Sequence, residues 1–206
     1  MPTILPPETP TLNPYPDRKR FTRDEVKFLV HNNLLTERYE LIDGEILVRM
    51  PQNPAHNTFL LLIAIWLEQT FGRLFVRTQQ TIEVADADCY TNYPEPDISV
   101  LTKPLHEFYS RHPKSDEVQL IVEVADTTYI TDKTIKSSLY ARAGVGEYWV
   151  ADVNNRQIFV YLAPTSNGYN AVSVYTAEEE IATLARLDAR IRVNDLFPPD
   201  VSSKEE

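Results

Sequence analysis

The sequence predicts a mixed α/β fold, in which a β-sheet is flanked by helices. Apolar, strand-like runs alternate with helical segments in the order αββ, αβββαβ and ββ. The 206 residues are 43% hydrophobic and 24% charged, which suits one globular domain with a sizeable core. We expect this single domain at residues 21–197, between a proline-rich flexible arm at 1–20 and a polar tail at 198–206.

The first half of the domain is expected to contain two helices and a hairpin. Residues 22–32 open with the capping-box pattern Thr-Arg-Asp-Glu and continue with apolar residues at helical spacing, so a short helix is predicted there. An Asp-Gly pair joins two apolar runs over residues 39–48, which is typical of a tight β-hairpin. Residues 57–71 predict a largely buried helix that a glycine ends.

The second half is expected to supply most of the sheet. Its one helix is predicted over residues 131–143, with Ile135, Leu139 and Tyr140 on the buried stripe and Gly144 as its end. Strands are predicted at residues 75–84, 97–101, 118–125, 147–152, 156–162 and 169–175. The last two strands form an antiparallel pair around a Ser-Asn-Gly turn.

Two acidic residues stand in segments that should otherwise bury hydrocarbon. Glu123 interrupts the apolar run at residues 118–125, and Asp97 opens the run at 97–101. A buried carboxylate costs several kcal/mol unless a cation, a metal or hydrogen-bond donors compensate it. Either acid alone could be the solvent-facing residue of a half-exposed strand. Two of them on separate strands, followed by a helix that carries lysines, suggest a divalent-metal site.

The composition argues against a disulfide-bonded protein, a membrane-spanning protein and broad electrostatic binding of nucleic acid. The single cysteine, Cys89, excludes an internal disulfide and fits a reducing compartment. No segment has the roughly 18 apolar residues of a membrane span, so a cytoplasmic location is expected. The net charge of −10 argues against broad electrostatic binding of nucleic acid, although a local basic groove is compatible with it.

Metal-dependent cleavage of a phosphodiester would use these residues in definite roles. Mg²⁺ or Mn²⁺ needs carboxylate and carbonyl oxygens, which Asp97, Glu123 and the backbone carbonyl of Val124 can supply from neighbouring strand ends. A cation must offset the charge that develops on the phosphate. Lys136 lies on the following helix, on the same face as Asp132 and Tyr140, whose expected role is to orient the helix.

Several short motifs, taken in order, resemble one known family. Pro96-Asp97 is followed 26 residues later by Glu123-Val124-Ala125, a pattern similar to the PD-(D/E)xK nuclease superfamily. The chain further resembles the Uma2 family, also called DUF820, which is widespread in cyanobacteria. The resemblance runs from about residue 21 to 197. The remaining motifs are YELIDGE at 39–45, His56 after Pro54, the acid-containing run at 122–128, Asp132 with Lys136 and Tyr140, and GVGEYW at 144–149.

The resemblance implies a fold, a metal site and an activity. The fold would be restriction-endonuclease-like, with an αβββαβ core, a four-stranded mixed sheet between two helices, and added β-hairpins. Asp97 and Glu123 would bind Mg²⁺ or Mn²⁺ together with the Val124 carbonyl. The lysine position of the superfamily motif is occupied by Ala125, so Lys136 is expected to take that role, with Lys133 as the fallback.

Other residues have a functional and a structural interpretation. Glu40 corresponds to a recurrent family acid that would line the same site, or it is the exposed member of a hairpin pair. His56 opens a helix and could cap it, bind substrate or pack. The aromatic residues Tyr148, Trp149 and Phe159 are most simply core residues rather than a platform for stacked bases.

The leading hypothesis is therefore a metal-dependent DNA endonuclease, with Asp97, Glu123, Lys136 and Glu40 as catalytic residues. One alternative is a catalytically inactive module that keeps the nuclease fold and binds a protein or nucleic acid; the acidic net charge and Ala125 favour it. Another is a hydrolase that acts on small phosphodiesters. A homodimer formed through the strands at 156–162 and 169–175 is a further expectation.

Overall fold

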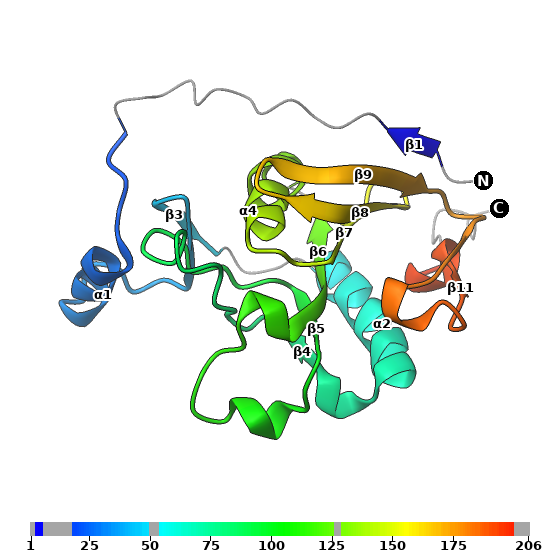
Figure 1. The fold of residues 1–206 in the computed structure, drawn as a ribbon, viewed down its shortest axis with the longest axis horizontal. Helices are drawn as coiled ribbons and strands as arrows, with labels where there is room; N and C mark the ends of the chain where they lie inside the picture. Colours follow the sequence, from blue (N-terminus) through cyan, green and yellow to red (C-terminus); the bar gives the residue numbers. More distant parts are fainter. Residues whose placement is uncertain (1–2, 6–17, 50–53, 126–128, 200–206) are drawn as a thin grey trace.

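A seven-stranded mixed sheet forms the centre of the structure, a computed structural model that describes residues 3–5, 18–49, 54–125 and 129–199. The strand order is β1-β9-β8-β7-β6-β5-β4, and all neighbours are antiparallel except β6 and β7 (Figure 1). The bounds are β1 Thr3–Leu5, β4 Val76–Thr78, β5 Ile98–Leu101, β6 Val118–Ala125, β7 Glu147–Asp152, β8 Gln157–Thr165 and β9 Gly168–Tyr175.

A helix covers each face of this sheet. Side chains alternate along a strand, so β6 sends Val122 and Val124 into one core and Ile121 and Ala125 into the other. The first core includes α2 (Pro54–Phe71), and the second includes α4 (Ser137–Arg142). The expected sheet between two helices is confirmed.

The hairpin of β2 (Tyr39–Ile42) and β3 (Glu45–Val48) lies beside α1 (Arg23–His31) at one end of the molecule (Figure 1). Asp43 and Gly44 have φ values of 46° and 76°, as a tight hairpin turn demands. A Cβ at Gly44 would lie 2.8 Å from the Cβ of Arg20, so the turn also needs glycine for packing. The predicted capping box is present, with Thr22 as the N-cap of α1.

The C-terminal segment packs against the α2 side of the sheet. It contains the two-stranded pair β10 (Glu180–Ile181) and β11 (Ile191–Arg192), and it buries Ile181, Leu196 and Phe197 in the same core as α2. Short 3₁₀ helices complete the chain: η1 Arg73–Phe75, η2 Leu105–Phe108, η3 Ser115–Glu117, η5 Leu184–Arg186 and η6 Val193–Leu196.

Two predicted elements differ from the structure. The strand expected at 75–84 is shortened to β4. The N–H of Gln79 still donates to the carbonyl of Asp97 in the β4–β5 register, but Gln79 adopts φ 52°, a left-handed conformation that ends the strand. The helix expected at 131–143 is built of α3 (Tyr129–Thr131), the π-helical turn η4 (Asp132–Lys136) and α4. Ile135 is 40% exposed, so its predicted place on the buried stripe is wrong, whereas Leu139 and Tyr140 are buried as expected.

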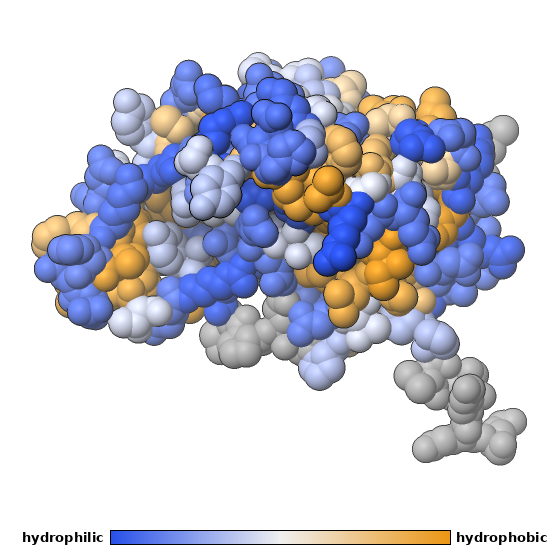
Figure 2. Space-filling view, turned by 90° about the horizontal axis from the view of Figure 1, so that it is seen from below, coloured by the Kyte–Doolittle hydropathy of each residue, from blue (hydrophilic) through white to orange (hydrophobic). Residues whose placement is uncertain are grey.

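The chain termini were predicted as a proline-rich arm and a polar tail, and most of these residues lie outside the described parts. Thr3–Leu5 is described and forms β1, which pairs antiparallel with β9. None of the described helices is long and apolar enough to cross a membrane. Figure 2 shows a mostly hydrophilic face with apolar areas near α1 and α2, whose exposed apolar residues include Phe28, Leu61 and Ile65.

Candidate active site

Four carboxylates from different elements converge between the hairpin, the sheet and the helix at η4. Glu40 comes from β2, Asp97 directly precedes β5, Glu123 lies in β6, and Asp132 begins η4. Their side chains are almost inaccessible, with residue exposures of 3%, 2%, 1% and 1% respectively. The alternative interpretation of Glu40, Asp97 and Glu123 as solvent-facing strand residues is therefore wrong.

The register between β5 and β6 brings the two predicted metal ligands together. Ile98 lies opposite Val122, so Asp97 and Glu123 occupy the next positions along the antiparallel pair. The backbone N–H of Val124 donates to Oδ2 of Asp97 at 2.9 Å. This bond fixes the Asp97 carboxylate against β6, one residue from Glu123.

Lys136 lies in the middle of the cluster. Its Nζ is 2.9 Å from Oε1 of Glu123, 3.1 Å from Oε2 of Glu40 and 3.5 Å from Oδ1 of Asp132. The lysine is itself 4% exposed. The structure thus brings Glu40, Asp97, Glu123 and Lys136 into one site, as the sequence predicted, while their chemical roles stay predictions.

Arg49 is a member of the site that the sequence analysis missed. Its guanidinium lies 3.0 Å from Oε1 of Glu40 and 3.4 Å from Oδ1 of Asp97, and it also donates to the backbone carbonyl of Glu95. The hairpin register contained a signal for it. Glu40 is opposite Leu47, and Arg49, two residues further along, lies on the same face of the hairpin.

Two tyrosines donate hydrogen bonds to residues of the site, one to the Glu123 side chain and one to the Asp132 backbone. The hydroxyl of Tyr140 donates to Oε1 of Glu123 at 3.0 Å, the same oxygen that Lys136 contacts. The hydroxyl of Tyr148 donates to the backbone carbonyl of Asp132 at 2.9 Å. The π-helical turn η4 directs both Asp132 and Lys136 inward, since both are buried while Ile135 is exposed.

The environment separates the pKa values of the two predicted ligands. Burial raises the pKa of Glu123 well above its usual range; Lys136 opposes this effect, and Asp97 adds to it. Burial also acts to raise the pKa of Asp97, but the nearby His56 imidazole and the charges of Arg49 and Lys136 outweigh it, so the pKa is lowered. Of these two carboxylates, Asp97 therefore stays ionised more readily.

The cations of the site are held in their charged forms. Burial acts to lower the pKa of Lys136, but the carboxylates of Glu123, Glu40 and Asp132 more than offset it, so the pKa is raised. The pKa of Arg49 is raised as well, because nearby carboxylates outweigh the effect of its burial. The raised pKa therefore favours the charged form of the Lys136 ammonium.

The backbone carbonyl of Val124 faces the Asp97 edge of β6. A residue in a strand directs its N–H and its C=O to the same side, and the N–H of Val124 bonds Asp97. Extended two residues beyond the Ile98–Val122 pair, the β5–β6 register would place Pro96 opposite Val124. Proline has no N–H, so Pro96 cannot donate a hydrogen bond from β5 to the Val124 carbonyl. The carbonyl therefore suits the ligand role that the resemblance implies.

The charges of the cluster fit a divalent cation. When ionised, the four carboxylates exceed the charges of Lys136 and Arg49 by two, which is the charge that Mg²⁺ or Mn²⁺ would supply. Hard oxygen donors are also the ligands that these ions prefer. In the described parts of the chain, no three Asp, Glu, His or Cys side chains already form a metal cage. An ion would have to compete with Lys136 for Glu123.

Other predicted residues lie outside the carboxylate cluster or at its rim. Nε2 of His56 is 3.7 Å from Oδ2 of Asp97, so His56 borders the site from α2. Lys133, the fallback lysine, instead lies with its Nζ 4.0 Å from the ring centre of Phe159. Tyr148, Trp149 and Phe159 are buried in the cores, which matches their structural interpretation.

Comparisons with known proteins agree with this architecture. The family model Uma2, described as "Putative restriction endonuclease", matches residues 31–193. A crystal structure of a DUF820 protein from Anabaena variabilis ATCC 29413, titled a "putative nuclease", has a TM-score of 0.59. It is 16% identical in sequence, and the match covers 82% of this chain and 96% of the other. The restriction-endonuclease-like fold class is thereby confirmed. No curated protein matches the chain.

Proposed function

Because the chain belongs to the Uma2 family, we propose that it is an endonuclease that hydrolyses the phosphodiester bonds of DNA with Mg²⁺ or Mn²⁺. The family description and the nuclease-fold neighbour support a nuclease-like function. One observation carries the finer proposal. Asp97 and Glu123 are buried side by side on neighbouring strands, and the ammonium of Lys136 lies 2.9 Å from Glu123.

In this proposal Asp97, Glu123 and the Val124 carbonyl hold the cation. When bound, the cation supplies a Lewis acid for a phosphate oxygen and lowers the pKa of a water ligand. Asp97 is suited to this task because its pKa is lowered, so it offers an anionic ligand at neutral pH. Tyr140 positions Glu123 by donating a hydrogen bond to Oε1, and the N–H of Val124 positions Asp97.

Lys136 supplies the positive charge that a lysine provides in the superfamily motif, where this chain has Ala125. Its ammonium is held by Glu40 and Asp132 as well as by Glu123, so it keeps anionic partners when a metal takes Glu123. A fixed, charged donor stabilises the negative charge that develops on a phosphate during hydrolysis. Since its pKa is raised, we assign this electrostatic role to Lys136 rather than proton abstraction from water.

The test is cleavage of supercoiled plasmid DNA by the purified chain with Mn²⁺ or Mg²⁺. We expect nicked and linear products, their loss when EDTA removes the metal, and their loss in Glu123→Gln. Glu107, an exposed acid on η2, offers a matched Glu→Gln control that should cleave like the unchanged chain. Cleavage that persists in EDTA, or equally in Glu123→Gln, would falsify the metal-dependent mechanism.

A non-catalytic module is the second candidate, and one observation favours it. Lys136 and Arg49 already contact Glu123, Glu40 and Asp97, so the carboxylates have cationic partners without a metal. Calorimetry distinguishes the candidates, because the module predicts no more Mn²⁺ binding than in Glu123→Gln. A hydrolase of small phosphodiesters would instead turn over a chromogenic phosphodiester without measurable affinity for DNA.

Two expectations accompany the nuclease proposal. A homodimer would cut both strands of a symmetric duplex, and light scattering of the purified chain tests its mass. The described β9 edge is paired with β1, so a dimer through that edge would first have to displace β1. A cytoplasmic location is proposed because the single cysteine fits a reducing compartment.

A further inference from the structure

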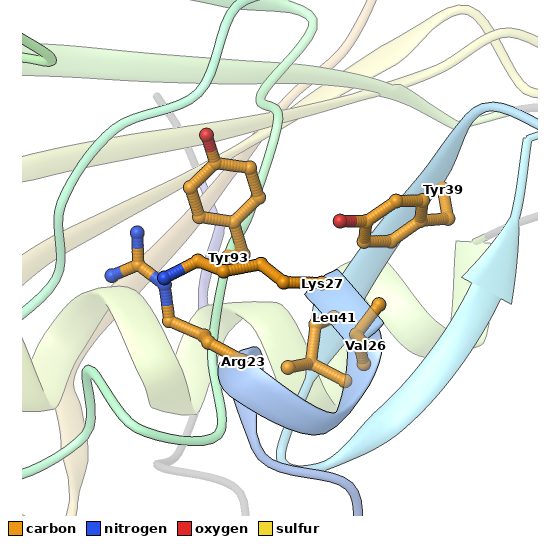
Figure 3. A pocket seen from close by; sticks show the side chains of 6 residues that line it. All are labelled: Arg23, Val26, Lys27, Tyr39, Leu41 and Tyr93. Carbon is orange, nitrogen blue, oxygen red and sulfur yellow. The ribbon is translucent and has the colours of Figure 1, made fainter. Parts of the chain in front are cut away.

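A second recess lies on the other side of β2 from the carboxylates. It is formed where α1, β2 and the segment at Tyr93 meet, and its volume is about 100 Å³. Its lining consists of Arg23, Val26, Lys27, Tyr39, Leu41 and Tyr93 (Figure 3). Pockets for whole cofactors or drug-sized ligands measure roughly 300–1,000 Å³. This recess is therefore suited to one chemical group rather than to a whole cofactor.

One wall of the recess is rigid because its polar groups are already bonded. Arg23 makes two hydrogen bonds to Glu83, at 2.6 and 3.0 Å, and its guanidinium carbon lies 4.5 Å from the ring centre of Tyr93. The hydroxyl of Tyr93 is 3.0 Å from Nε2 of His112. The charge of Arg23 is thus largely neutralised, and its role is to order the Tyr93 ring.

Two polar groups remain for a ligand. Lys27 pairs only with Asp24 among the described residues, at 3.1 Å, and both side chains are mostly exposed, so this pair holds the ammonium weakly. The hydroxyl of Tyr39 has no hydrogen-bond partner in the described part of the chain, and in Figure 3 it points into the space between the tyrosine rings. One ammonium and one phenol above an apolar floor can bind an anionic group attached to a flat ring.

The charge distribution favours this end of the molecule for a polyanion. Residues 18–49 contain seven Lys or Arg and six Asp or Glu, whereas the whole chain has a net charge of −10. The excess of negative charge therefore lies elsewhere in the chain. A nucleic-acid strand would meet less repulsion over α1 and the hairpin than over the average surface.

We infer that this recess binds one nucleotide of a single-stranded stretch of the nucleic acid that reaches the carboxylate site. Lys27 and the Tyr39 hydroxyl contact a phosphate in the recess, and the adjoining base or sugar lies against the ring of Tyr93. The inference rests on the proposed nuclease function. Tyr39 and Glu40 are consecutive residues of β2 and face opposite sides, so one strand connects the recess to the carboxylate cluster.

The test measures binding of a labelled single-stranded oligonucleotide by fluorescence anisotropy in EDTA, where metal-dependent cleavage cannot occur. We expect Lys27→Ala to weaken binding about tenfold and to reduce the slope of log K against log salt by about 0.7, the value for one phosphate on a single strand. Tyr39→Phe should weaken binding about threefold through the lost hydrogen bond. Lys103→Ala is the matched control, because Lys103 is also exposed and paired with an acid, Glu117.

The outcomes separate the recess from the nuclease proposal. Weaker binding in Lys27→Ala but not in Lys103→Ala supports the recess, even if the unchanged chain cleaves no DNA and the nuclease proposal fails. Equal effects of the two lysine variants, or no binding by the unchanged chain, overturn the recess. Cleavage by the unchanged chain with the same KM in Lys27→Ala also overturns it and leaves the nuclease proposal intact.

Discussion

The ammonium nitrogen of Lys136 lies 2.9 Å from Oε1 of Glu123 in a place that solvent barely reaches. Burying either charge alone would cost several kcal/mol, so each side chain depends on the other in the folded chain. Glu40 shares the same ammonium at 3.1 Å. In the nuclease proposal, the helix would therefore supply the lysine, because Ala125 stands at the strand position where the superfamily motif has it.

Replacing Lys136 tests its proposed role, and replacing Lys133 provides the comparison. In Lys136→Met the charge is lost and an unbranched side chain remains, so we expect plasmid cleavage with Mn²⁺ to fall by at least about 100-fold. The melting temperature should also fall, because breaking a buried pair costs about 3–5 kcal/mol. Cleavage rates and thermal melts of the same preparations give both values.

Lys133→Ala is the control for this prediction. The Nζ of Lys133 lies 4.0 Å from the ring centre of Phe159, so its loss should leave cleavage within about threefold. Calorimetry of Lys136→Met adds a second measurement. The folded variant should still bind Mn²⁺, since a competitor for Glu123 is gone. A folded Lys136→Met that cleaves at the original rate would rule out the lysine's proposed role.

The metal ligands are tested by binding rather than by activity. Asp97→Asn keeps the shape of the side chain, and its remaining carbonyl oxygen can still accept the Val124 N–H. We expect the Mn²⁺ affinity measured by calorimetry to fall at least about tenfold, because an anionic ligand is lost. The exposed Glu107→Gln serves again as control. Unchanged Mn²⁺ affinity in Asp97→Asn would show that the ion binds elsewhere.

Tyr140 is expected to act as a positioning residue. Its hydroxyl donates to Oε1 of Glu123 at 3.0 Å, so Tyr140→Phe removes one hydrogen bond and keeps the buried ring. Loss of such a partner of a metal ligand typically costs about 10–100-fold in metal affinity or activity. We expect the Mn²⁺ concentration for half-maximal cleavage to rise about tenfold while KM for DNA stays constant. A loss of melting temperature with no change in Mn²⁺ dependence would indicate a structural role alone.

The sequence predicts most of the elements because their signals are local. The Asp43-Gly44 turn and the capping box at Thr22 each depend on neighbouring residues, and both occur as expected. The strands β5 and β6 are likewise predicted by their apolar runs. Their antiparallel register, which the structure shows, explains why Asp97 and Glu123 meet. The residues that converge on one site were thus largely identifiable from pattern and resemblance.

The features that were missed depend on tertiary contacts. Arg49 follows the hairpin, and only the β2–β3 register places it on the face of Glu40. The left-handed conformation of Gln79 ends β4, although the alternating pattern of residues 75–84 continues past it. Ile135 was misplaced because helical periodicity assumes an α-helix, and η4 is π-helical. Neither the Gln79 conformation nor the π-helical turn has a distinctive local sequence signal, whereas the position of Arg49 follows from the hairpin register.

Glu147, outside the carboxylate site, should make the stability of the chain depend on pH. Its side chain is buried and accepts hydrogen bonds from the Trp149 indole at 2.8 Å and the Leu184 N–H at 2.8 Å. Burial raises its pKa from 4.5 to about 7 and outweighs these bonds, which act to lower it. Tyr169 and Tyr175 interact with Glu147, and their raised pKa values keep them neutral in this range.

The direction of this pH dependence follows from proton binding to Glu147 in the folded and unfolded chain. Between pH 4.5 and 7 the folded chain holds the Glu147 proton and the unfolded chain has lost it, so stability falls as pH rises through this window. The full effect is about 3 kcal/mol, and it levels off above the folded pKa. Glu147→Gln cannot titrate, so the slope of unfolding free energy against pH should become shallower than in the unchanged chain. Urea unfolding at several pH values measures this slope. Identical slopes in both chains would mean that Glu147 is ionised in the folded state.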